Sequence, residues 1–346
     1  MKKNKIAIFP YVKNSPNKYI ERMAKAITYA FPNVELLPFP RTRNLVSVKN
    51  FDYVWLNWFE NLPQSNKIKE FILKIGTIFV LKIMGIKIVA SFHNKRPHDS
   101  NDNIWERLLF NYIFRSAHRI IILSSDSKDI LKEKFGKKVL KKVVLVPHPT
   151  YECTPKNNNP NNKFSILFFG FLRPYKNIDL IFELAKIYHD IQFTIAGNAI
   201  DNDYKIYLKK KAKSIPNVTL IPHFLTENEI DTLIESNSIL LLPYNIESSL
   251  NSGVIIHAIC KKINMIVPQI GTVNQLKNKN MIFSYTYNSQ KSHLQELIRM
   301  IQSAKYEYEN EIAKFNNRVN ILYDDVMSTN SPEALSYQIL QVFNDD

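Results

Sequence analysis

Short apolar runs alternate with longer amphipathic segments along the whole chain, in two successive series. The runs, such as Ser165–Phe169, are nearly continuous in apolar residues, as expected for strands that are buried on both faces. Parallel sheets covered by helices on both sides bury their strands in this way. The pattern therefore predicts an α/β fold with two doubly wound, Rossmann-like domains and a cleft between them.

The expected elements follow from the two periodicities. Strands are expected at 6–9, 53–57, 87–91, 119–123 and 143–146, and then at 165–169, 192–196, 218–221, 239–242, 265–267 and 281–284. Helices are expected at 18–30, 67–84, 102–117, 126–135, 176–188, 202–213, 227–236, 253–261, 290–316 and 332–343. The last helix is preceded by Ser331-Pro332, a favourable N-cap and first-turn pair.

A polar segment separates the two series. Residues 154–163 read TPKNNNPNNK, with no apolar side chain apart from the prolines, which is typical of an exposed linker. We expect an N-terminal domain at 1–150, a linker at 151–163, a C-terminal domain at 164–330, and a final helix in 331–346 that crosses back to the first domain. The two cysteines, Cys153 and Cys260, have neither metal-site spacing nor a disulfide framework, and no leader pattern opens the chain.

The charge is concentrated in the first half. Residues 1–150 carry 27 Lys and Arg against 11 Asp and Glu, a formal charge of +16, whereas residues 151–346 carry 19 against 20, a formal charge of −1. A compositional bias toward Lys would affect both halves. A basic domain beside a neutral one indicates an anionic partner for the first, and the candidates are anionic lipid, a pyrophosphate-linked acceptor or nucleic acid.

Glycines mark one edge of the second predicted sheet. Only 7 glycines occur in the chain, and four follow strands of the second series: Gly170, Gly197, Gly253 and Gly271. Open α/β sheets bind ligands beyond the carboxyl ends of their strands. The glycines therefore indicate a site where backbone approaches a ligand.

Two segments at this edge favour a diphosphate. In FFGFLRPYKN (168–177), Arg173 and Lys176 follow a strand and can neutralise phosphate charge. In LPYNIESSLNSGV (242–254), Asn251-Ser252-Gly253 opens a helix whose free N–H groups bind phosphate well.

These segments resemble the donor domain of GT-B glycosyltransferases, specifically family 4-like and related bacterial enzymes of capsule and exopolysaccharide assembly. The segment VPQIGTVNQL (267–276) resembles the family's loop after the next strand. In the first half, WLNWFE (55–60), SFHNKRPHD (91–99) and the loop with Pro10 and Asn17-Lys-Tyr19 resemble family segments in the expected order.

The resemblance implies an acceptor-binding N-terminal domain and a nucleotide-sugar-binding C-terminal domain. The reaction would be hexosyl transfer from a nucleoside-diphosphate sugar, UDP- or GDP-linked, to a glycan acceptor expected to be lipid-linked. No bound cofactor or metal is expected, because cations and a helix start do that work in this family. The protein would act in the cytoplasm, peripherally at the inner face of the plasma membrane, in surface polysaccharide biosynthesis.

The resemblance also assigns candidate site residues. The donor phosphates would contact Gly170, Arg173, Lys176, Asn251, Ser252 and Gly253. The donor sugar or nucleobase would lie near Gly197, His223, Glu247 and Gly271. The acceptor would contact Asn17, Tyr19, Trp58 and Glu60, and the catalytic candidates are His93, His98 and Asp99.

The stereochemical outcome is left open. Many family 4 enzymes carry two glutamates separated by seven residues; here Glu247 fits the first, whereas the second position is Ile255. If configuration is inverted, Asp99 or His98 is the candidate base for the acceptor hydroxyl. If it is retained, His93 matters more, as a sugar contact.

The segment 67–84 has a further property. Its longest uncharged run, 75–81, is too short to cross a bilayer. An amphipathic face is expected, either covering the sheet or docking on a membrane. Its apolar members are Ile68, Phe71, Ile72, Ile75, Phe79 and Ile83, with Lys67, Lys74 and Lys82 elsewhere.

Two other functions are alternatives. One is a sugar-nucleotide epimerase of the same fold. The other is a basic nucleic-acid-binding protein, against which stands the lack of a recognised nucleic-acid module, so no nucleic-acid partner is expected.

Overall fold

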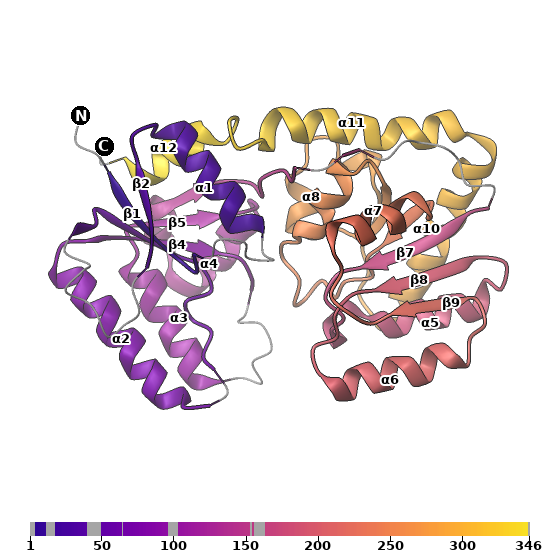
Figure 1. Ribbon diagram of the computed structural model, residues 1–346, viewed down its shortest axis with the longest axis horizontal. Helices are drawn as coiled ribbons and strands as arrows, with labels where there is room; N and C mark the ends of the chain where they lie inside the picture. The colour runs from indigo at the N-terminus through magenta and orange to yellow at the C-terminus, as the bar shows by residue number, and fades with distance from the viewer. Residues whose placement is uncertain are drawn as a thin grey trace. The chain divides into compact units, whose positions relative to one another are not determined.

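The computed structural model describes residues 4–11, 18–39, 50–63, 65–95, 103–152, 154–155 and 163–344. The chain divides into two compact units: unit 1 comprises residues 1–149 and 329–346, and unit 2 comprises 150–328. Each unit contains a six-stranded sheet with helices packed against it (Figure 1). All strand pairs are parallel, which confirms the predicted fold class.

The sheet of unit 1 has the order β2-β1-β3-β4-β5-β6. Its strands are β1 (Lys5–Phe9), β2 (Glu35–Pro38), β3 (Tyr53–Leu56), β4 (Lys87–Phe92), β5 (Arg119–Ile122) and β6 (Val143–Leu145). Its helices are α1 (Lys18–Ala30), α2 (Lys67–Ile83), α3 (Ile104–Ser116), α4 (Ser127–Phe135), the 3₁₀ helix η2 (Lys137–Lys142) and α12 (Ser336–Phe343). The order reverses between β1 and β3, and open α/β sheets bind ligands beyond the strand ends at such a reversal.

The last helix completes the core of unit 1. Helix α12 packs against α1 and against β5 and β6, and Figure 1 shows it in yellow beside the indigo α1. Its Phe343 ring meets Tyr53 edge-on at 5.4 Å. The same cluster contains Trp55, whose Nε1 donates a hydrogen bond to Ser91 Oγ at 2.8 Å. The core of unit 1 therefore joins the two ends of the chain.

The sheet of unit 2 has the order β12-β11-β10-β7-β8-β9. Its strands are β7 (Ser165–Phe169), β8 (Gln192–Ala196), β9 (Val218–Ile221), β10 (Ile239–Leu241), β11 (Asn264–Pro268) and β12 (Phe283–Tyr285). Its helices are η3 (Pro174–Lys176), α5 (Ile178–Ile187), α6 (Asn202–Lys213), α7 (Glu227–Glu235), α8 (Gly253–Cys260), α9 (Gly271–Gln275), η4 (Lys279–Met281), α10 (Gln290–Asn310) and α11 (Ile312–Asn330). Here the order reverses between β7 and β10, so a ligand is expected near the loops that follow these two strands.

The predicted elements were wrong in three places: one strand was missed, one helix is broken into two, and one helix begins later than expected. Strand β2 was not expected, because it is a half-exposed edge strand that lacks a continuous apolar run and ends at Pro38. The single helix expected at 290–316 is broken at Glu311, where the chain turns and Phe315 packs against Phe283 and Tyr308. The last helix begins at Ser336 rather than 332, because Ser331 closes a separate turn by accepting from the Ala334 amide.

Of the two roles left open for the apolar face of α2, covering the sheet is wrong. The helix buries Lys74, Thr77, Ile78 and Leu81 against its unit. Four residues of the expected apolar face are largely exposed: Ile68, Ile72, Phe79 and Ile83. The buried Lys74 ammonium donates to the Phe59 and Asn61 carbonyls at 2.9 and 2.7 Å, so a charged residue lies where an apolar one was expected. No helix within the described part of the chain is long and apolar enough to span a membrane.

Candidate functional site

Two neighbouring strands of unit 2 end in glycines whose backbone no other residue could adopt without strain. Gly170 follows β7 with φ +131°, and Gly197 follows β8 with φ +143°. The Gly170 amide donates to the Ala196 carbonyl at 3.0 Å, so the two strand ends lie against each other. A Cβ on Gly197 would come within 1.8 Å of the Gly170 carbonyl oxygen. Glycine is therefore required at Gly197 by close approach as well as by conformation.

The loop after β7 carries the two predicted phosphate-binding cations. The 3₁₀ turn η3 places the Lys176 ammonium 3.7 Å from the centroid of the Tyr244 ring. Arg173 lies over Phe171, with its Cζ 5.5 Å from the ring centroid. Burial, and after it the nearby Arg173 charge, lower the pKa of Lys176 to about 7. An anion bound there would return Lys176 to its charged form.

The loop after β10 meets this turn. Asn177 stands at positive φ, +52°, and its side-chain amide donates to the Pro243 carbonyl at 3.0 Å. The Tyr244 hydroxyl lies 3.1 Å from Ser252 Oγ, and the Ser252 amide donates to Thr272 Oγ1 at 2.9 Å. These contacts join the segments that follow β7, β10 and β11.

Helix α8 starts at this junction. It begins at Gly253, and no side chain caps its first turn. The free amides of that turn and the positive end of its dipole are suited to an anion. Lys176 and the α8 start are thus linked through one intervening side chain, Tyr244.

The other predicted donor residues lie in loops and at helix starts that follow strands of unit 2. Gly271 is the first residue of α9, next to Thr272, and Asn251 directly precedes Ser252. Glu247 is exposed, and its amide donates to Asn245 Oδ1 at 2.8 Å. His223 follows β9 and pairs with Glu229 of α7 at 2.8 Å.

In unit 1 the structure brings three predicted residues together. His93 follows β4 and stacks on Trp58, with ring centroids 4.2 Å apart and an 18° interplanar angle. Tyr19 meets the His93 ring edge-on at 4.9 Å. These side chains come from α1 and from the segments after the adjacent strands β3 and β4.

A residue that sequence reasoning missed orients His93. The Asn57 side-chain amide donates to the Phe9 carbonyl at 3.2 Å, which leaves its oxygen facing His93 Nε2 at 3.0 Å. Nε2 therefore carries the proton in this arrangement. The signal was available, since Asn57 lies inside the segment WLNWFE, directly before the strained Trp58 at φ +50°.

Glu60, another predicted acceptor contact, is buried near the charged side chains of Lys74 and Glu106. Burial raises its pKa to about 7, while the Lys74 charge opposes the rise and Glu106 adds to it. Of the remaining predicted residues, Asn17, His98 and Asp99 lie outside the described residues. Across the described ranges, no group of three or more His, Cys, Asp and Glu side chains is arranged to hold a metal ion.

The chain is similar to known proteins in two ways. A family model described as Glycosyl transferases group 1 matches residues 152–249, less than a third of the chain. No curated protein matches the sequence.

Solved structures are similar over the full length. The crystal structure of HepE from Anabaena in complex with UDP and glucose has a TM-score of 0.72 at 14% identity, covering 100% of both chains. Sucrose-phosphate synthase from Thermosynechococcus elongatus has a TM-score of 0.70 at 13% identity, covering 99% of this chain and 98% of that chain. A glycosyltransferase from Rickettsia africae has a TM-score of 0.66 at 12% identity, covering 100% of both chains. The chain therefore has the GT-B fold, with two doubly wound α/β units.

Proposed function

We propose that the protein is a glycosyltransferase that moves a sugar from a nucleoside-diphosphate sugar to a glycan acceptor. The arrangement around Lys176 carries this proposal. A largely desolvated ammonium has a pKa held near neutrality, and no carboxylate pairs with it among the described residues. Arg173 lies in the same loop, and Tyr244 links Lys176 to Ser252, the residue before the uncapped start of α8. This combination is suited to a diphosphate that gains charge as it leaves.

The residues would act as follows. The bond between the sugar anomeric carbon and the diphosphate oxygen breaks, and the acceptor hydroxyl forms the new bond while losing its proton. Negative charge then develops on the departing diphosphate. Arg173, Lys176 and the α8 amides stabilise that charge, as preorganised donors do in a desolvated site.

Unit 1 would supply the acceptor side. We place His93 as a sugar contact, since Asn57 and the Trp58 ring fix its orientation. Tyr19 belongs to the same aromatic cluster and would contact the acceptor. Asp99, or His98, remains our candidate base for an inverting reaction.

The donor is expected to be a UDP-sugar. The similar HepE structures contain UDP or UDP-glucose, which supports a uridine donor. Thermal shift with UDP-, GDP-, dTDP- and CMP-sugars should show the largest stabilisation with a UDP-sugar, about 2.7 kcal/mol at a concentration 100 times Kd. Stabilisation by none of the four would contradict the proposal. Turnover that isomerises the donor without releasing nucleoside diphosphate would indicate an epimerase instead.

We further propose that unit 1 docks on an anionic membrane, which would give access to a lipid-linked acceptor in bacterial surface polysaccharide synthesis. The support is the exposed face of α2, formed by Ile68, Ile72, Phe79 and Ile83. Helix α3 packs beside α2 and exposes Ile104 and Leu108. Exposed Lys69, Lys82, Arg107 and Arg115 lie on the same two helices. Apolar side chains with basic neighbours are typical of helices that lie in the interface of anionic bilayers.

Ile72→Glu is expected to weaken binding to anionic liposomes about tenfold, because an exposed apolar side chain can no longer enter the interface and a like charge is added. Flotation with liposomes of defined composition measures the effect, and binding should also fall with salt. Ile206→Glu is the matched control: Ile206 is similarly exposed, 56% against 61%, but lies on α6 of unit 2. Equal losses in both variants, or equal binding to neutral liposomes, would contradict the docking face.

A further inference from the structure

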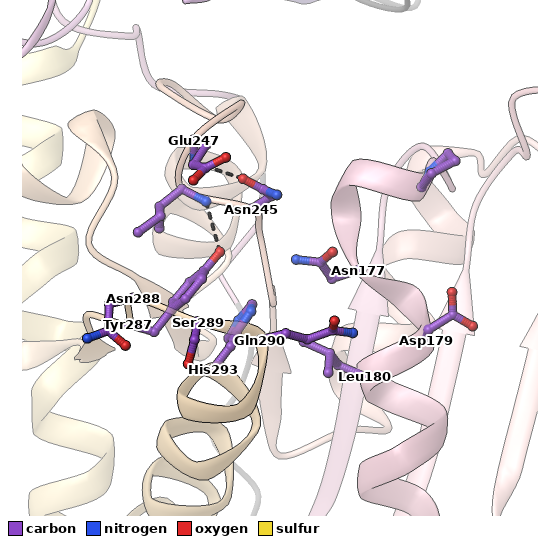
Figure 2. Close-up of a pocket in the computed structure, with 12 residues that line it drawn as sticks. Asn177, Asp179, Leu180, Asn245, Glu247, Tyr287, Asn288, Ser289, Gln290 and His293 are labelled. Atoms are coloured by element: carbon purple, nitrogen blue, oxygen red, sulfur yellow. Dashed lines mark hydrogen bonds between the residues drawn. The ribbon is translucent and has the colours of Figure 1, made fainter.

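Unit 2 contains a cavity of about 350 Å³ that the predicted phosphate site does not use. It lies among the segments that follow β7, β10 and β12, and none of Arg173, Lys176 and Ser252 lines it. Of the predicted donor contacts, Glu247 alone belongs to its described lining, so the cavity adjoins the predicted donor site at that residue. Figure 2 shows Asn177 and Asn245 entering the gap from opposite walls, with Gln290 below them. Its volume falls at the lower end for small-ligand sites.

The walls present hydrogen-bonding groups that the protein itself leaves unused. Asn245 uses its oxygen to accept from the Glu247 and Ser248 amides, so its NH₂ group remains available. Asn177 uses its NH₂ group toward Pro243, so its oxygen remains available. Gln290 is exposed at the cavity, and neither end of its side-chain amide has a partner among the described residues.

The charge of the lining excludes an anionic ligand. Among the described residues that line the cavity there is no Lys or Arg, and the carboxylates belong to Asp179 and Glu247. Asp179 is already paired with Lys211 and Tyr207. His293 stays neutral, because burial lowers its pKa to about 4. A ligand that fits must therefore both donate and accept hydrogen bonds without negative charge.

One wall is aromatic and held in place. The Tyr287 and His293 rings stack at 3.8 Å with an interplanar angle of 7°. The Tyr287 hydroxyl donates to the Tyr244 carbonyl at 3.1 Å and accepts from the Ile246 amide at 3.0 Å. The wall is thus ordered before any ligand arrives, which lowers the cost of binding.

We propose that this cavity binds a neutral hexose ring, as a carbohydrate subsite separate from the nucleotide site. Vicinal hydroxyls both donate and accept, which matches the free Asn245 NH₂ group, the free Asn177 oxygen and the Gln290 amide. The identity of the ligand as a sugar unit of a glycan rests on the proposed glycosyltransferase function. Such a subsite would hold a glycan chain on the unit that binds the donor.

Saturation-transfer NMR with the methyl glycosides of glucose, galactose, mannose and N-acetylglucosamine tests the subsite directly. At least one glycoside should bind wild-type protein, both alone and with UDP-glucose saturating the nucleotide site, whereas glucose 6-phosphate should not bind there. Gln290→Met and Asn245→Asp should each weaken glycoside binding about 3- to 10-fold, the loss expected for one or two hydrogen bonds. Asn245→Asp keeps the oxygen that orders the loop.

Gln295→Met is the matched control, because Gln295 is exposed on the same helix and lies outside the cavity. It should bind the glycoside as wild type does. Glycoside binding that UDP-glucose abolishes, or that survives in Gln290→Met combined with Asn245→Asp, would overturn the subsite. UDP binding with no glycoside binding would overturn it while leaving the proposed function intact, and failure of UDP to bind would count against the proposed function alone.

Discussion

Arg173→Ala and Lys176→Ala are each expected to lower kcat by about 10- to 1000-fold, the range for losing a charge contact to a transition state. Each cation lies in the loop after β7, where the strand order reverses, and Lys176 stands over Tyr244, whose hydroxyl lies 3.1 Å from Ser252 Oγ. The effect is measured as the rate at which nucleoside diphosphate is released from a UDP-sugar. Lys186→Ala is the matched control, an exposed lysine on α5 outside the loop.

The depressed pKa of Lys176 adds a second readout. Without a ligand, Lys176 loses its charge as pH rises through about 7, whereas a diphosphate binds its charged form. UDP affinity should therefore fall by up to about tenfold per pH unit above 7. Lys176→Arg stays charged, so its affinity should lack this dependence. Full turnover in the double alanine variant, or a wild-type affinity that is flat across this range, would remove Lys176 from the site.

Gly197→Ala is expected to destabilise unit 2 by about 4 kcal/mol or more, a loss that arises only from a few specific mechanisms. Two of them act together here. The new Cβ would lie 1.8 Å from the Gly170 carbonyl oxygen, and φ at +143° strains any L side chain. Neither strand end can move away easily, because the Gly197 amide donates a hydrogen bond to the Ile221 carbonyl and the Gly170 amide donates one to the Ala196 carbonyl.

Two other glycines grade the effect. Gly170→Ala meets only Val254, at 3.5 Å, so backbone strain of about 1–3 kcal/mol should account for its whole loss. Gly76→Ala has open space on α2 and should be neutral or stabilising by up to about 1 kcal/mol. Urea unfolding of the three variants measures the series. A Gly197→Ala protein as stable as the Gly76→Ala protein would refute the close approach of the two strand ends.

The fold was predictable because its buried strands are nearly continuous apolar runs. Strand β7, for example, is buried at every position, and so is β11. The errors arose where the pattern of apolar residues along a helix differs from the set of side chains that the folded protein buries. Lys74 is buried because backbone carbonyls at 59 and 61 accept from its ammonium, a satisfaction that no periodicity reveals. Conversely, exposed Phe79 and Ile83 matched the core pattern of a sheet-covering helix.

The positions of the candidate site residues were partly predictable. Glycines and cations at strand ends indicate an edge, because parallel strands end together. The sequence did not reveal which side chains link the loops. Tyr244 supports Lys176 and also reaches Ser252, although Lys176 is far from both of these residues in the chain. Asn57 orients His93 across 36 positions, a pairing that only the strand order β1-β3-β4 creates.

The position of α12 has a consequence for synthesis. Leu335, Ile339, Val342 and Phe343 fill the same core as β1, yet they are synthesised after the whole of unit 2. All of unit 2 therefore emerges from the ribosome before the core of unit 1 can be completed. During that interval, the apolar core residues of the first half lack their cover from α12 and can bind chaperones. Unit 2, which lies between the two parts of unit 1 in the sequence, can already fold.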